Sequence, residues 1–363
     1  FLPASGVPLY GTVEVSGGQP LLRVTSTAPQ PDLEQLGRAW SRDEDVEQAM
    51  LEPEALSLVI APSLRASRGG VPLLVEVLDP GRYRDRVRAL PGADALLDRT
   101  VVLVGLGSVG SDLGARLVRL GVRVVGCDPD RLAVENLIRW GLPVPLEPHV
   151  GRTKAEVWVE ELRRTVPGAS VEAHAIDVVR DAGRFEAIVE RERPALLVAA
   201  TDTADSRRVV NAAAARHATP ALFVALSDGA ASVRIESVPD ARSGPCHLCA
   251  ERAEGIAPEG FGGTRRSRTP YGSEASPPAT AVAALPVDVA IGTGLATRIA
   301  VLLLTGADEG AWFSHREQHG NVLFVSLRRD TWVFEEAWDR LVYQVERDPE
   351  CPVCGDAETN DVV

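Results

Sequence analysis

A glycine-rich turn that begins at Gly105 has the spacing of a phosphate-binding loop. Gly105, Gly107 and Gly110 directly follow an apolar run and open a segment with helical periodicity. Glycines at this spacing let the backbone turn tightly and approach a phosphate, and the helix N-terminus adds free N–H groups and a favourable dipole. Asp128 ends the next apolar run, where a carboxylate can accept both ribose hydroxyls. These residues predict a nucleotide site, although a glycine turn without a ligand and an NAD-dependent oxidoreductase would show the same two features.

Five further polar residues favour a triphosphate over a dinucleotide. They are Asp130, Asn136, Arg139, Lys154 and Asp202. We expect them to converge at the C-terminal ends of parallel strands, where open α/β sheets bind ligands. Lys and Arg match the charge of a triphosphate, and Asp130 and Asp202 suit Mg²⁺, which takes carboxylate and phosphate oxygens together. The set therefore predicts ATP and Mg²⁺. An oxidoreductase would need a residue for hydride transfer, and no histidine stands out for that work.

Four of the five cysteines form two Cys-x-x-Cys pairs, Cys246 with Cys249 and Cys351 with Cys354. Two such pairs can make a closed tetrahedral zinc site of the structural kind. The count favours metal binding in a reducing compartment over a secreted disulfide framework. Two disulfides and four unpaired thiols are the alternatives. The fifth cysteine, Cys127, is expected to be a small buried hydrophobic residue.

Apolar runs alternate with helical segments between residues 100 and 240, which predicts βαβ units and an α/β fold with a doubly wound, mostly parallel, Rossmann-like sheet. Continuous apolar character suits parallel strands that are buried on both faces. The predicted strands are 101–104, 122–127, 171–176, 196–199 and 221–226, and the predicted helices are 109–120, 153–165, 183–191 and 204–217. Two more strand-like runs lie within 321–345.

The most apolar stretch is 281–304, and it contains Pro286, Asp288 and Arg298. Charges inside a membrane span cost several kcal/mol, so we expect a buried core helix here and no membrane contact. The net charge of −13 argues against a nucleic-acid partner that needs a basic face. The first residues have no basic n-region, so no signal peptide is expected and the cytoplasm is the predicted location.

The chain is expected to have two domains. Residues 1–78 predict a small α+β domain with strands at 20–24, 56–60 and 73–78 and a helix over 32–50. It contains neither His nor Cys, which favours a partner-binding or peptide-binding role. Residues 79–363 form the second domain, which opens with a basic helix over 82–90.

Together these motifs resemble the ThiF/MoeB/HesA family of adenylyltransferases, whose fold is shared with ubiquitin-activating enzymes. The resemblance runs from about Arg82 to Cys354. It is carried by the Arg-Tyr segment at 82–88, the three glycines, Asp128, Asp130, Asn136, Arg139, Gly151 to Lys154, Thr201, Asp202, Arg207, Asn211 and the two cysteine pairs. It implies that ATP is bound and that a carboxylate is adenylated with release of pyrophosphate.

The resemblance also implies roles for individual residues. Asp128 would hold the ribose, Asn136, Arg139 and Lys154 the phosphates, and Asp202 the Mg²⁺ ion. An arginine of the basic helix, Arg82 or Arg86, would reach the γ-phosphate in the neighbouring subunit of a homodimer.

Family members that pass the substrate to their own cysteine carry that thiol after the first zinc pair, and this chain has none between Cys249 and Cys351. The resemblance therefore implies adenylation without a thioester on this chain. The substrate would be the C-terminus of a ubiquitin-like or sulfur-carrier protein. The alternative is a precursor peptide of natural-product biosynthesis, with the N-terminal domain as a peptide clamp. The loop 251–280, with Arg265, Arg266 and Arg268, would cover the substrate's tail or be a disordered basic loop.

Overall fold

The computed structural model describes residues 10–16, 19–25, 37–40, 56–59, 65–68, 71–78, 80–90, 92–253, 284–306, 321–331 and 333–355. The chain divides into two compact units, Phe1–Arg86 and Val87–Val363. The sequence had placed this division after residue 78.

The first unit contains a six-stranded mixed sheet in the order β1-β2-β6-β5-β4-β3. Its strands are β1 (Tyr10–Ser16), β2 (Gln19–Thr25), β3 (Gly37–Trp40), β4 (Leu56–Val59), β5 (Arg65–Arg68) and β6 (Val71–Leu78). The helix predicted over 32–50 is wrong at β3, because pairing with β4 overrides the local helical spacing there. The rest of that predicted helix lies outside the described residues. The basic segment forms η2 (Pro80–Arg84) and the short α2 (Asp85–Arg88), which is followed by η3 (Ala93–Leu96).

The second unit is built on an eight-stranded sheet in the order β14-β13-β12-β11-β10-β7-β8-β9. Its strands are β7 (Thr100–Val104), β8 (Arg123–Cys127), β9 (Val171–His174), β10 (Leu196–Ala199), β11 (Ala221–Leu226), β12 (Ser232–Val238), β13 (Val322–Ser326) and β14 (Arg340–Tyr343). Along the sheet, the neighbouring strands β9, β8, β7, β10 and β11 pair in parallel. The neighbouring strands β11, β12, β13 and β14 pair in antiparallel fashion. The predicted doubly wound, mostly parallel fold is confirmed.

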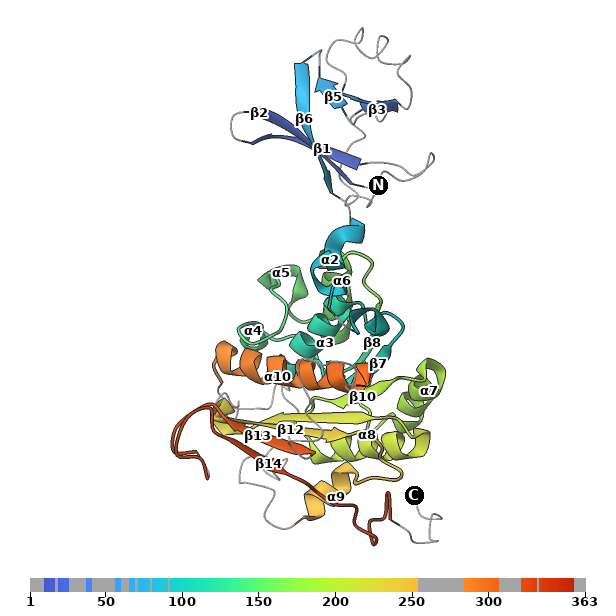
Figure 1. Cartoon of the computed structure of the whole chain (residues 1–363), viewed down its shortest axis with the longest axis vertical. Coiled ribbons are helices and arrows are strands. Elements are labelled where there is room, and N and C mark those ends of the chain that lie inside the picture. Colours follow the sequence, from blue (N-terminus) through green and yellow to red (C-terminus); the bar gives the residue numbers. More distant parts are fainter. Residues whose placement is uncertain are drawn as a thin grey trace. The chain divides into compact units, whose positions relative to one another are not determined.

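Helices cover both faces of this sheet (Figure 1). One face carries α3 (Ser108–Leu120), α6 (Lys154–Thr165) and α10 (Pro286–Thr305), and the other carries α7 (Ala182–Glu192), α8 (Ala204–His217) and α9 (His247–Arg252). Strand β7 serves both layers, because Val101 and Leu103 join one apolar cluster while Val102 and Val104 join the other. This alternation follows from the two-residue period of a strand and explains the continuous apolar run.

The order of the parallel strands creates a switch point. The chain builds β7, β8 and β9 outwards in one direction and then returns to place β10 on the other side of β7. Open α/β sheets bind ligands outside the carboxyl ends of the strands at such a point. The turn after β7 and the turn after β10 therefore flank the expected ligand position.

Helix α10 is the one helix in the described part of the chain that is long and apolar enough to cross a membrane by length and composition. It packs against α3 and against strands β11 and β12, and residues such as Ala296 and Ala300 are fully buried. Its buried threonines donate to backbone carbonyls four residues earlier, as Thr293 does to Val289. These contacts agree with the predicted core helix.

Truncating Leu103 should destabilise the second unit, because this fully buried side chain lies in the central strand β7. We expect Leu103→Ala to lower the free energy of unfolding by about 2–5 kcal/mol. The matched control is Leu97→Ala, at a side chain that is 40% exposed, which should cost less than about 1 kcal/mol. Denaturant unfolding of both variants measures the difference, and equal costs would contradict this placement of the core.

Candidate active site

Two of the three turn glycines are required by close backbone packing, and the third is not. Gly105 has φ +93°, and a Cβ there would lie 2.5 Å from the carbonyl oxygen of Ala200. A Cβ on Gly110 would lie 1.8 Å from the carbonyl oxygen of Gly105. Gly107, the N-cap of α3, would place its Cβ in open space. The turn is thus closed against β10 on one side and open at Gly107, where a phosphate can approach the helix N-terminus.

The Asp128 carboxylate joins the glycine turn to the end of β8. It accepts hydrogen bonds from the backbone N–H of Leu106, at 2.6 Å, and from that of Asp130, at 2.8 Å. Burial raises the pKa of the Asp128 carboxyl above its ordinary value, while the Lys154 ammonium and the two backbone donors act in the opposite direction. A carboxylate held this way has a fixed position at the switch point.

Lys154 is buried at the start of α6 and faces two carboxylates. Its Nζ lies 2.7 Å from Oδ2 of Asp130 and 3.9 Å from Oδ1 of Asp128. Burial lowers the pKa of Lys154, but the charges of Asp128, Asp130 and Asp202 outweigh it, so the pKa lies above its ordinary value. The ammonium therefore stays charged at neutral pH. It is a buried cation beside the glycine turn.

The segment with Asn136 and Arg139 is anchored to the same turn. Asn136 lies in α4 (Val134–Leu137), and its Oδ1 accepts from the N–H of Ala133, which fixes the start of this short helix. The indole N–H of Trp140 donates to the carbonyl of Leu106 at 2.8 Å. Sequence reasoning missed Trp140, whose one signal was a tryptophan directly after Arg139.

Asp202 belongs to the turn after β10, next to the glycine turn. A Cβ on Gly105 would lie 3.1 Å from Cγ2 of Thr201, so the two turns touch. Asp202 itself is exposed, and its charge acts on both Lys154 and Arg207. The buried Arg207 guanidinium donates to the carbonyl of Thr201 from Nε at 3.2 Å and from Nη2 at 2.8 Å.

The structure thus brings most of the predicted nucleotide residues to one edge of the sheet. Hydrogen bonds and ion pairs join the glycine turn, Asp128, Asp130 and Lys154. Asp202 follows Thr201, which lies against Gly105, and the segment of Asn136 and Arg139 is attached through Trp140. Arg86 is exposed and belongs to the first compact unit, whereas all the others belong to the second. Arg265, Arg266 and Arg268 lie outside the described residues.

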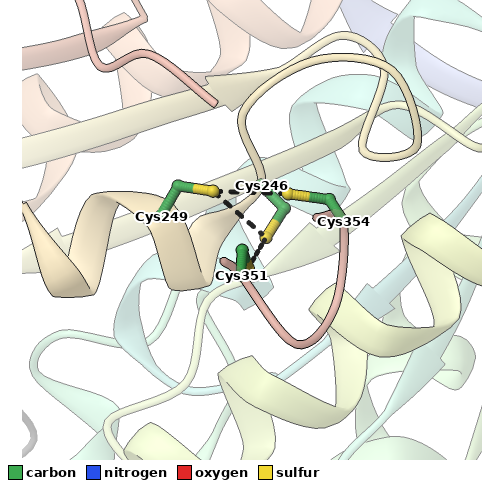
Figure 2. A group of neighbouring side chains, drawn as sticks. All are labelled: Cys246, Cys249, Cys351 and Cys354. Atoms are coloured by element: carbon green, nitrogen blue, oxygen red, sulfur yellow. Dashed lines mark hydrogen bonds between the residues drawn. The ribbon is translucent and has the colours of Figure 1, made fainter. Parts of the chain in front are cut away.

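The four paired cysteines meet in one buried cluster (Figure 2). The Sγ atoms of Cys246 and Cys249 are 3.9 Å apart, those of Cys246 and Cys351 3.6 Å, and those of Cys249 and Cys354 3.3 Å. Zn–S bonds of about 2.3 Å in a tetrahedron place neighbouring sulfurs about 3.8 Å apart. The cluster is therefore compatible with a zinc ion, and its separations exceed the S–S bond of a disulfide, about 2.05 Å.

The residues around the cluster have their own partners. Asn211 donates from Nδ2 to Sγ of Cys246 at 3.4 Å and accepts at Oδ1 from the N–H of His247 at 2.9 Å. The His247 ring stacks on Phe223, and its Nδ1 lies 2.9 Å from a Glu236 carboxylate oxygen. His247 is therefore held by Glu236 rather than by the sulfur cluster.

Cys127, the fifth cysteine, is buried at the end of β8, as expected. Burial raises the pKa of its thiol to about 12, so at neutral pH it is a neutral thiol rather than a nucleophilic thiolate.

Comparison with known proteins gives a family match and several partial likenesses. The model of the ThiF family matches residues 84–329, about two-thirds of the chain. Escherichia coli MccB, solved with ATP, covers 73% of this chain and 69% of its own at a TM-score of 0.51 and 16% identity, which shows a shared fold.

Two curated relatives match over shorter stretches. The ATP-dependent ubiquitin transferase-like protein Cap2 of Pseudomonas aeruginosa is 32% identical over 96 residues, 25% of this chain and 17% of Cap2. Erythronate-4-phosphate dehydrogenase of Cronobacter sakazakii is 65% identical over 37 residues, 10% of each protein and about the length of one βαβ unit. The chain thus spans between a tenth and a quarter of the length of the curated relatives it matches.

The two glycines that differ in their surroundings should differ in their tolerance of a methyl group. Gly110→Ala should unfold the second unit or lower its melting temperature sharply, since the Cβ would overlap the carbonyl of Gly105. Gly107→Ala should melt within a few degrees of the unmodified protein, because its Cβ meets nothing within 4 Å. Thermal unfolding of both variants checks this, and a stable Gly110→Ala protein would contradict the geometry of the turn.

Proposed function

We propose that this chain, which belongs to the ThiF family of adenylyltransferases, acts on a small ubiquitin-like or sulfur-carrier protein. It would use ATP to adenylate the C-terminal carboxylate of that protein. The coarser activity, adenylation of a peptide or protein carboxylate, follows from family membership. The observation that carries the proposal is the buried Lys154, held between Asp128 and Asp130 beside a glycine turn that is open at Gly107.

ATP would bind across the switch point between β7 and β10. The glycine turn and the N-terminus of α3 would receive phosphate oxygens. Asp128, at the end of β8, would hold the ribose, and Asn136, Arg139 and Lys154 would hold the phosphates. Since Lys154 is already charged and in place, its attraction for a polyphosphate needs little reorganisation.

The reaction is a displacement at the α-phosphorus. A carboxylate oxygen of the substrate forms a bond to this phosphorus, the bond to the oxygen that bridges to the β-phosphorus breaks, and pyrophosphate leaves with the electron pair. The residues of the site would position the two substrates and neutralise the charge on the phosphates. Arg139 and Lys154 would neutralise the negative charge that grows on pyrophosphate. Mg²⁺, when bound, would supply further positive charge there, and the exposed carboxylate of Asp202 together with Asp130 suits it.

The nucleophile that consumes the acyl adenylate would come from another molecule. No cysteine lies between Cys249 and Cys351, and Cys127 is a buried neutral thiol. A thioester on this chain is therefore not proposed. A sulfur donor, an amine or a partner enzyme's cysteine would attack the adenylate.

A precursor peptide of natural-product biosynthesis is the second candidate substrate. The likeness to MccB, which has been solved in complex with N-formylated MccA, favours it. The stretch in common with Cap2, whose name describes a ubiquitin transferase-like protein, favours a ubiquitin-like substrate. In the peptide case, the first unit would act as a clamp on the peptide.

The four-cysteine cluster would hold a structural Zn²⁺ ion. All four sulfurs are buried, and the three Sγ separations given above lie between 3.3 and 3.9 Å, against about 3.8 Å in a zinc tetrahedron. Four thiolates would fill such a site and leave no position for a reacting water. Zinc would join Cys351 and Cys354 to α9 and so fix this segment against that helix. Such a site suits the reducing cytoplasm, where we place the enzyme.

A homodimer would complete the site. Ile138 is 71% exposed and lines a hollow with Arg139 and with Pro286 and Val289 of α10. Val287, next to them, is 58% exposed. An exposed apolar surface beside the phosphate-binding residues suits a second copy of the chain, whose Arg86 or Arg82 would approach the γ-phosphate.

Arg139→Ala and Asp202→Asn should each lower ATP–pyrophosphate exchange at least about 100-fold. Arg139→Ala removes a positive charge proposed to act on the departing pyrophosphate, and Asp202→Asn removes a carboxylate proposed to hold Mg²⁺. Exchange is measured with radiolabelled pyrophosphate and two substrate sets, small proteins ending in Gly-Gly and short peptides with free C-termini. Arg119→Ala and Asp205→Asn, at exposed residues of α3 and α8, are the matched controls and should keep full activity. Full exchange in a folded Arg139→Ala or Asp202→Asn protein would refute the assigned roles.

Metal analysis of the purified chain should find one zinc ion per chain. Cys249→Ala should lose the ion and melt at a lower temperature, because the binding free energy of a structural zinc contributes to folding. Cys127→Ala, which also removes a buried thiol, should keep the ion. If both variants retained zinc, or if neither variant nor parent held it, the proposed zinc site would be wrong.

A further inference from the structure

The turn that carries Asp202 is held by the first turn of α8. Thr203 caps the helix, since its Oγ1 accepts from the N–H of Ser206, and the Ser206 hydroxyl donates back to the Thr203 carbonyl at 3.0 Å. On the other side of Asp202, the Thr201 carbonyl receives two hydrogen bonds from Arg207. Both neighbours of Asp202 are therefore fixed by α8, while the Asp202 side chain remains exposed.

The same helix reaches the cysteine cluster one turn further along. Asn211 lies four residues after Arg207, so the two side chains share a face of α8. Asn211 is 1% exposed, and both ends of its side-chain amide form hydrogen bonds. Its Nδ2 donates to Sγ of Cys246, and its Oδ1 accepts from the N–H of His247, the first residue of α9. Two buried polar side chains on one helical face thus contact the Asp202 turn and the cysteine cluster.

We infer that α8 ties the position of Asp202 to the integrity of the four-cysteine cluster, with Arg207 and Asn211 as positioning residues. The inference rests on the role proposed above for Asp202. A helix is stiff along its axis, so a shift at Asn211 would be carried one turn along α8 to Arg207 and its contact with Thr201. Loosening the cluster would therefore displace the start of α8, and with it the carboxylate of Asp202.

The contact of Asn211 with a sulfur is the kind that orients a metal ligand from outside the ligand set. Removing such a partner costs about 10–100-fold in metal affinity in metal proteins. Asn211→Leu keeps the side-chain volume and removes both hydrogen bonds. It should accelerate zinc release to a chromogenic chelator by about 10–100-fold. It should also raise the Mg²⁺ concentration that half-saturates ATP binding, measured by calorimetry.

Three further proteins separate this coupling from general loosening. Arg207→Lys keeps the charge but loses the two-pronged contact with Thr201, so it should shift the Mg²⁺ dependence and leave zinc release unchanged. The unmodified chain stripped of zinc by a chelator should show the Asn211→Leu shift. Arg208→Lys, the same substitution at an exposed neighbour that pairs with Glu251, should change neither measurement.

The outcome that overturns the inference is specific. If Asp202→Asn shifts the Mg²⁺ dependence while Asn211→Leu and the stripped chain bind ATP and Mg²⁺ as before, α8 does not couple the two sites.

If Asp202→Asn itself has no effect, the proposed role of Asp202 fails, and hydrogen exchange of the amides at 203–207 decides the coupling alone. Faster exchange in Asn211→Leu and in the stripped chain would support it, and unchanged exchange would refute it. Should Asn211→Leu fail to fold, Asn211→Asp, which keeps the acceptor and removes the donor to Cys246, takes its place.

Discussion

The proposed nucleotide site depends on the hydrogen bonds and the ion pair of one buried carboxylate, that of Asp128. It receives the backbone N–H of Leu106 from the glycine turn and that of Asp130 from its own strand end, and it faces Lys154 at the start of α6. A buried charge is costly unless it is paired and hydrogen-bonded, so the three partners are mutually required. Asp128 thereby fixes the ends of β7 and β8 and the start of α6 relative to one another. The lysine that would meet a polyphosphate has its position set before any ligand arrives.

The second unit divides its sheet between two tasks. The parallel strands β7 to β11 bring the proposed nucleotide-binding residues to one edge, and the antiparallel strands β12 to β14 support the region of the cysteine cluster. Cys351 and Cys354 come from the far end of the chain and meet Cys246 and Cys249 at α9. Helix α8 begins beside Asp202 and passes Asn211 to the cluster, so it belongs to both regions. This position is the basis for the proposed coupling between the four-cysteine cluster and the turn of Asp202, which lie one helical turn apart along α8.

The sequence predicted what depends on local pattern. Continuous apolar runs located β7, β8 and β10, and the spacing of the cysteines located the cluster. Strand β12 was not predicted, because it alternates apolar residues with Arg234 and Glu236, which look like surface positions. Both are buried, since Arg234 pairs with Glu236 and Glu236 with His247, and such partners become visible only after folding. Trp140 was missed for the same reason: its hydrogen bond to Leu106 spans 34 positions of sequence. In the first unit, the pairing of β3 with β4 outweighed helical spacing.

Transfer of an oxygen atom from substrate to AMP tests the central claim most directly. A substrate whose C-terminal carboxylate carries ¹⁸O is incubated with the enzyme, ATP and Mg²⁺, with hydroxylamine added as the acceptor nucleophile. If the carboxylate attacks the α-phosphorus, its oxygen stays on that phosphorus when hydroxylamine attacks the carbonyl carbon, and mass spectrometry finds one ¹⁸O in the released AMP. ADP and ¹⁸O-labelled inorganic phosphate as the products would place the attack at the γ-phosphorus and contradict adenylation at this site.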